Sequence, residues 1–127
     1  KWDVEHGWIK GDHGQHMQHP AVVGDAVYLR PCGYRIEDGT LLTENMPPYE
    51  GGCATFAGTR DALIYRGKEG AISLWDVSKE TVSHWYSIRP GCWLSTIAAG
   101  GMILSPEGGG GCSCGGWLET SIGFSPR

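Results

Sequence analysis

The sequence predicts an all-β fold made of about three four-stranded antiparallel units. Three segments repeat one pattern, in which two apolar runs flank a tight turn that contains glycine: Ala21–Leu29, Thr55–Tyr65 and Thr96–Leu104. A repeat of about 40 residues built from short hairpins is typical of stacked or radial β repeats. The 21 glycines, six Trp and five Tyr favour turns and strands, because large rings pack well on a pleated surface. No apolar window suits a long helix.

Length and composition indicate one domain over residues 1–127. A chain of 127 residues can bury a sizeable core, and no stretch rich in Pro, Ser or charge marks a boundary. The formal net charge is −4 and no Lys/Arg cluster stands out, so we expect no nucleic-acid partner. We also expect no membrane span, because no apolar run reaches the required length of about 20 residues.

The first unit covers residues 20–50. Its expected turns are Gly24-Asp25 and Glu37–Gly39, whose residue types suit hairpins. We expect strands Pro20–Val23 and Ala26–Leu29 on either side of the first turn, and strands Tyr34–Ile36 and Thr40–Leu42 on either side of the second.

The second unit, 51–90, repeats this order, and the third unit, 91–127, repeats it in part. The second unit's expected strands are Thr55–Ala57, Ala62–Tyr65, Ala71–Asp76 and Thr81–Tyr86. The third unit's expected strands are Leu94–Ala98, Met102–Leu104 and, after a Gly-rich loop, Trp117–Phe124. A fourth strand is missing there. The N-terminal part, 1–19, contains an alternating segment, Lys1–Ile9, that could supply it, followed by a His-rich loop.

The repeated pattern resembles the blades of quinoprotein-alcohol-dehydrogenase-like β-propellers, which carry PQQ-like repeats. The segments Pro20–Leu29 and Tyr34–Thr40 match the opening and the end of such a blade. The stretch Arg89–Cys114 is similar to the closing blades of large secreted bacterial proteins of this type. The resemblance implies a secreted or periplasmic location. Because propellers have about four to eight blades, three blades imply a partner: the remainder of a longer propeller chain or identical copies.

The redox cofactor of that family is not expected in this chain. The sequence has no adjacent cysteine pair and no acidic cluster placed to hold calcium beside pyrroloquinoline quinone. It also lacks the Cys-x-x-Cys-His sequence that attaches haem covalently.

The repeat places every cysteine at one edge of the sheets. In antiparallel four-stranded units, the second-to-third turns and the connections between units lie at the same edge. We expect there Cys32, Cys53, Cys92, Cys112 and Cys114, together with the loop histidines His13, His16 and His19. The sequence therefore predicts one Cys/His-rich edge.

One interpretation of this edge is that disulfides staple it. Cys53 and Cys92 occupy equivalent positions, so a bridge between them would join neighbouring units. Cys112 and Cys114 are too close in sequence to bridge each other comfortably, and Cys32 is one candidate partner for them. The five cysteines, an odd number, favour a secreted chain with bridges and a remaining thiol.

A second interpretation is a metal site. His13, His16 and His19 supply imidazoles, and Cys112 with Cys114 supplies thiolates. Zn or Cu accepts such a mixed set of ligands. His84, beside a tryptophan in an expected strand, is interpreted as structural.

A third interpretation is catalysis on an anionic polysaccharide, by analogy with propeller-type lyases. Such enzymes neutralise a uronate carboxylate with Arg and remove the adjacent proton with His or Tyr. The residues of these types near one edge are His16, His19, Tyr28, Arg30, Tyr34 and Arg35. The function expected first is nevertheless a propeller segment that presents its Cys/His-rich face for ligand, metal or partner binding; the lyase is the alternative.

Overall fold

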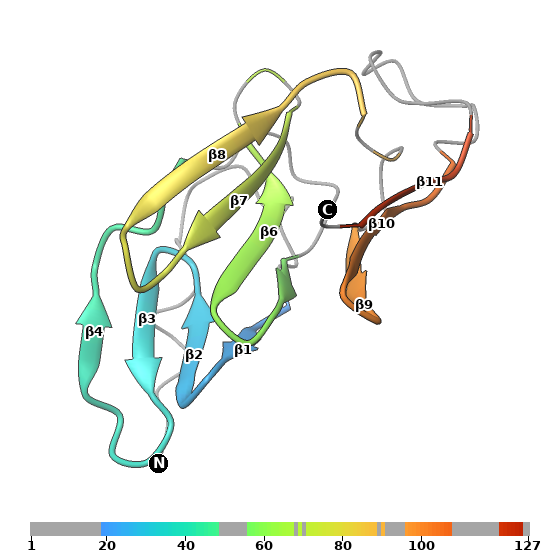
Figure 1. The fold of residues 1–127 in the computed structure, drawn as a ribbon. Helices are drawn as coiled ribbons and strands as arrows, with labels where there is room; N and C mark the ends of the chain where they lie inside the picture. The colour runs from blue at the N-terminus through green and yellow to red at the C-terminus, as the bar shows by residue number, and fades with distance from the viewer. Residues whose placement is uncertain are drawn as a thin grey trace.

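The protein is all-β, with three antiparallel sheets arranged one after another along the chain (Figure 1). The computed structural model describes residues 19–48, 56–67, 69, 71–88, 90, 96–107 and 120–125. Within these residues there are eleven strands and no α-helix. The predicted fold class is confirmed to this extent.

The first two sheets each have four strands, which pair in sequence order as the repeat predicts. The first sheet contains β1 (Ala21–Val23), β2 (Ala26–Leu29), β3 (Cys32–Arg35) and β4 (Leu41–Thr43). The second contains β5 (Ala57–Gly58), β6 (Ala62–Arg66), β7 (Ile72–Asp76) and β8 (Thr81–Trp85). The third sheet has the order β11-β10-β9, formed by β9 (Ile97–Ala99), β10 (Met102–Ser105) and β11 (Ile122–Phe124).

Glycines in the left-handed region close the first turn of the first and third sheets. Gly24 has φ of 59°, and Gly100 and Gly101 have φ of 58° and 74°. Only glycine adopts such angles without strain from a side chain, and they suit the two-residue turns that join twisted antiparallel strands. The repeated pattern therefore folds into the predicted hairpins.

Gly58 has a different role from the one that the repeat suggested. It lies in strand β5 instead of the turn, because Thr59 donates its backbone N–H to the carbonyl of Ala62, 2.8 Å away, and so pairs one residue later. A Cβ atom at Gly58 would collide with the backbone oxygen of Val22 in β1. Glycine is thus required here for the close approach of two strands from different sheets.

Other boundaries also differ from the expectation. The third strand begins at Cys32 and not at Tyr34, because Cys32 pairs with Leu29 and leaves only Arg30-Pro31 as the turn. The fourth strand begins at Leu41 and not at Thr40, because the backbone N–H of Thr40 donates to Oδ1 of Asp38 in the preceding turn, 2.9 Å away. These shifts preserve the order of the strands.

The core lies between the first and second sheets. It contains buried side chains from both: Ala21, Val23, Ala26, Tyr28, Met46, Phe56, Leu63, Tyr65 and Trp75. The rings of Tyr28 and Trp75 meet edge to face, with centroids 5.5 Å apart. Aromatic rings favour this arrangement because the positive edge of one meets the negative face of the other. Packing of the first sheet against the second therefore forms the core of the described residues.

The first strands of the three sheets lie beside one another. Strand β5 contacts β1 on one side and β9 on the other. Beyond β9, Ser105 in β10 is almost fully buried and its hydroxyl donates to the carbonyl of Ile88, just after β8, at 2.9 Å. The first strand of each sheet thus lies beside the first strand of the next.

Candidate interaction surfaces

The two faces of each sheet are named by the order of the sheets along the chain. The upstream face is on the side of the preceding sheet and the downstream face is on the side of the following sheet. The first sheet's upstream face and the third sheet's downstream face are the two outermost faces of the array. In the second sheet, the upstream face carries a row of paired residues across its four strands: Gly58, Leu63, Trp75 and Val82. Leu63 and Trp75 are buried against the first sheet, and Val82 packs on the same core. This row is the second sheet's half of the core.

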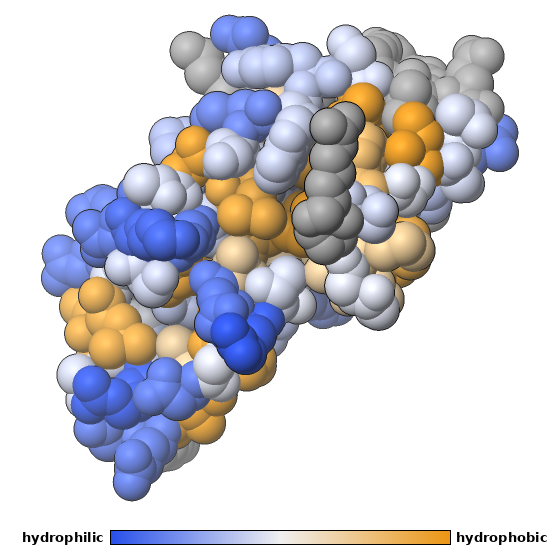
Figure 2. All heavy atoms as spheres, in the orientation of Figure 1, coloured by the Kyte–Doolittle hydropathy of each residue, from blue (hydrophilic) through white to orange (hydrophobic). Residues whose placement is uncertain are grey.

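The first sheet repeats this row on its own upstream face. The paired residues are Val22, Val27, Tyr34 and Leu41. No sheet covers them among the described residues: Val22 is 55% exposed and Leu41 is 43% exposed. Leu42, the extra residue at the irregular pairing of β3 with β4, adds another exposed leucine. Figure 2 shows hydrophobic atoms at the surface over β4.

The third sheet is exposed on both faces: Phe124, which pairs with Ile103 on its upstream face, is 39% exposed. Its upstream side carries Ser105, which reaches the end of the second sheet. Its downstream face carries Ile97, Leu104 and Gly123, which pair with one another, and Met102. Ile97 is 52% exposed and Met102 is 39% exposed. The two outermost faces of the three-sheet array therefore both carry exposed apolar side chains, which makes them candidate interaction surfaces.

Tyr28, one of the predicted catalytic residues, is part of the core. It pairs with Ala21 and Gly33 and points toward Trp75. Burial raises the pKa of its hydroxyl, and the charge of Asp25 raises it further. A buried phenol with a raised pKa keeps its proton at neutral pH.

The other described candidates lie apart from one another. Arg30 is in the β2–β3 turn, and its charge acts on Tyr65 of the second sheet. Arg35 lies at the opposite end of β3, with Nη1 3.3 Å from Oδ2 of Asp38. Tyr34 is half-buried in the upstream row, and His19 is exposed before β1. The described residues do not form one cleft.

Cys32 is, with His19, one of the two described members of the predicted Cys/His-rich edge. It is a free, half-buried thiol at the start of β3 and pairs with Leu29. Strand alternation places both on the upstream face of the first sheet, because their neighbours Tyr28 and Gly33 turn toward the core. The predicted partners His13, His16, Cys53, Cys92, Cys112 and Cys114 lie outside the described residues.

His84 has a partner that the sequence alone did not identify. Its Nδ1 is 2.7 Å from Oγ of Ser73, its neighbour across β7 and β8. Ser73 is fully buried and Gly67 lies directly over its hydroxyl, so no substrate can reach this oxygen. The pair fixes the orientation of an exposed imidazole, whose ring lies 6.4 Å from that of Tyr86. Cross-strand register, unknown before folding, is what brings Ser73 and His84 together.

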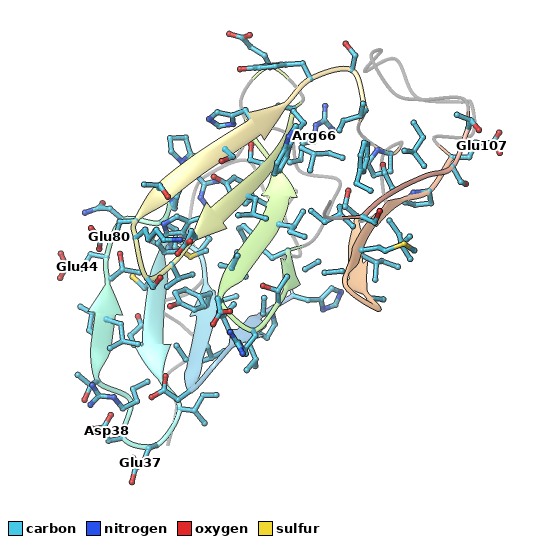
Figure 3. The ribbon with its side chains drawn as sticks, in the orientation of Figure 1. Glu37, Asp38, Glu44, Arg66, Glu80 and Glu107 are labelled. Atoms are coloured by element: carbon cyan, nitrogen blue, oxygen red, sulfur yellow. The ribbon has the colours of Figure 1, made fainter. Side chains whose placement is uncertain are left out.

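Local hydrogen bonds hold charged side chains in place at the tips of the hairpins. Figure 3 shows Glu37 and Asp38 at the tip of the first sheet, and Glu80 and Arg66 at opposite ends of the second. Asp76 accepts hydrogen bonds from the backbone and side chains of Ser78 and Lys79. These bonds, led by the one from Lys79, lower the pKa of Asp76 to about 2. The charged groups therefore serve the turns.

Two further kinds of site, a metal site and a membrane-spanning helix, are not found among the described residues. Over the described ranges, no group of three or more His, Cys, Asp or Glu residues is placed to hold a metal ion. In the same ranges, no helix is both long and apolar enough to cross a membrane. Comparison of the chain with protein-family models, with curated proteins and with solved structures found no match.

Proposed function

We propose that this chain is a β-propeller segment that works as a protein-interaction module, joining further blades or partner proteins through its two outermost sheet faces. The segment's Cys/His-rich edge would be a separate binding surface, and its cysteine content supports the proposed secreted or periplasmic location. Protein interaction is the function that the packing of the sheets supports best.

One observation carries this proposal: the first sheet presents an apolar row on each of its faces. Its downstream face is buried on the second sheet, while the row Val22, Val27, Tyr34 and Leu41 faces outward. A sheet with one solvated face normally alternates apolar and polar residues, whereas a sheet covered on both faces is apolar on both. The first sheet has the composition of an inner blade.

The order of the strands supports the propeller in particular. Blades of a propeller are four-stranded meanders whose innermost strands surround the centre. Here two four-stranded meanders and one three-stranded sheet follow one another, with β1, β5 and β9 adjacent. Hence the outermost faces are the places at which further blades would pack.

Nile red, an uncharged dye that fluoresces in apolar surroundings, tests whether the outer face can bind. We expect the dilute protein to take up dye and Leu41→Lys to reduce the uptake, because a charge interrupts the apolar row. Tyr86→Lys is the matched control, because Tyr86 is also a large exposed side chain, 55% exposed, but follows β8 in the second sheet.

The two variants must unfold at the same temperature as the parent chain, so that dye uptake reports the surface and not loosened packing. Equal dye uptake by the Leu41→Lys variant and the parent chain would contradict the proposed interaction face.

A further inference from the structure

We propose that the upstream face of the first sheet binds the downstream face of the third sheet of a second copy of this chain, and that two copies close a six-sheet ring. This inference rests on the proposed function and names its partner. The packing of the first sheet on the second, inside the chain itself, is the template for this contact between copies.

Structural equivalence between the sheets is set by their pairing. In each sheet the first strand pairs with the second across the first turn, so Ala26, Ala62 and Met102 occupy one equivalent position. Tyr28, Ile64 and Leu104 follow two residues later on the same faces. The upstream positions between them, Val27, Leu63 and Ile103, are equivalent in the same way.

The third strands extend this equivalence. Tyr34, Trp75 and Phe124 are the cross-strand partners of those three upstream residues. All three are aromatic. Gly33 and Gly123 also occupy equivalent places, as partners of Tyr28 and Leu104. The repeat thus preserves the residue types at the face-to-face contact.

The internal interface supplies the template for the external one. Inside the chain, Tyr28 on a downstream face meets Trp75 on an upstream face at 5.5 Å. The equivalent positions on the two outermost faces are Leu104 on the downstream face and Tyr34 on the upstream face. Stacking a second copy in the same way brings these two together.

The two faces are also compatible in charge. The upstream row of the first sheet contains Val22, Val27, Tyr34 and Leu41, and the downstream face of the third contains Ile97, Ala99, Met102, Leu104 and Gly123. Neither set includes a charged side chain, so docking desolvates no ion. Because the two faces differ from each other, the contact is heterologous.

Ring size selects two copies. Two chains supply six sheets, within the range of about four to eight blades that propellers use. In that ring each upstream face meets the other copy's downstream face, and both contacts are made at once. No apolar end then remains open.

Sedimentation equilibrium of the full chain tests this assembly. We expect the parent chain to sediment at twice the chain mass, and both Leu41→Glu and Met102→Lys to sediment as the single chain. Tyr86→Glu, in the second sheet and outside both faces, should stay at twice the chain mass. A parent chain that remains single at every concentration, while still taking up dye at the Leu41 face, would overturn the second copy as partner and leave the interaction face standing.

Combining the two charges identifies which faces meet. The double variant L41E/M102K places opposite charges on the two faces, so we expect the dimer to return at low salt and weaken as salt rises. The matched variant L41K/M102K, with like charges, should stay single. If each face instead bound its own equivalent, L41E/M102K would place Glu against Glu. Failure of L41E/M102K to dimerise where the parent does would therefore overturn the heterologous pairing.

Discussion

The first and second sheets contain the same row of apolar residues, yet the row is buried in one and exposed in the other. Leu63 and Trp75 of the second sheet are 0% and 4% exposed, whereas their equivalents Val27 and Tyr34 are only half-buried. Val22 and Leu41, at the two ends of the first sheet's row, are 55% and 43% exposed. Pairing and alternation are alike in the two sheets. The difference is the neighbour: the second sheet has the first sheet against this face, and the first sheet has none among the described residues.

This contrast separates two roles of an apolar pattern. Alternation within a strand decides which side chains share a face, because successive side chains point to opposite sides. Burial, and with it most of the stabilisation, depends on a second layer that covers the face. An equivalent row can therefore be core in one sheet and an interface in the next.

The largest expected difference between the two sheets is at their aromatic positions. Trp75→Ala should lower the free energy of unfolding by about 3–5 kcal/mol, because it removes a large ring from the core. Tyr34→Ala should cost about 1 kcal/mol, near the typical value for a single substitution.

Denaturant unfolding measures both values at Tyr34 and Trp75, in the L41K/M102K background so that assembly does not contribute. Equal losses would mean that the first sheet's upstream face is already covered within one chain.

A smaller effect is expected where the first strands of the two sheets meet. Gly58→Ala adds a Cβ that collides with the Val22 carbonyl, so β1 and β5 must separate. We expect a loss of about 1–3 kcal/mol, the usual cost of overpacking. Val22→Ala, at the equivalent position of the first sheet, should change stability by no more than about 0.5 kcal/mol. Thermal unfolding compares the two variants, and a harmless Gly58→Ala would contradict the close approach of β1 to β5.

The smallest expected effect concerns the turn aspartates, Asp76 in the second sheet and Asp38 in the first. The pKa of Asp76 falls from 3.8 to about 2 on folding, so its charge favours the native state above the unfolded-state pKa. Asp76→Asn should lower the melting temperature at neutral pH, and the difference should fade as the pH falls from 3.8 toward 2.

Asp38→Asn is the matched change, because hydrogen bonds from Thr40 lower the pKa of Asp38 as well. We expect a smaller shift in melting temperature there, because Asp38 accepts fewer bonds than Asp76 does. A difference between parent and Asp76→Asn that grows toward pH 2 would contradict the assignment.

Much of the fold was predictable because it depends on local pattern. The glycines at 24 and 100, between apolar runs, indicated hairpins, and strand order followed from short connections. The repeat predicts a turn at Gly58, because the sequence alone does not distinguish a glycine needed for a turn from one needed for a close approach of two strands. Its reason lies in Val22, which belongs to another sheet.

The candidate site was less predictable. Strand register could have suggested that Ser73 faces His84, but that register depends on where the β7–β8 turn closes. Tyr28 was assigned to a catalytic edge by residue type, whereas its place between Gly33 and Trp75 makes it core. Residue type alone does not show which sheet a side chain packs against.

The sequence by itself determined the all-β class, the repeated hairpins and the alternation that gives each sheet two apolar faces, because these depend on residues close together in the chain. Only the tertiary structure decided which apolar face is buried and which stays open. Leu63 and Val27 occupy equivalent positions in their strands, and they differ because the first sheet covers Leu63, whereas no sheet covers Val27 among the described residues.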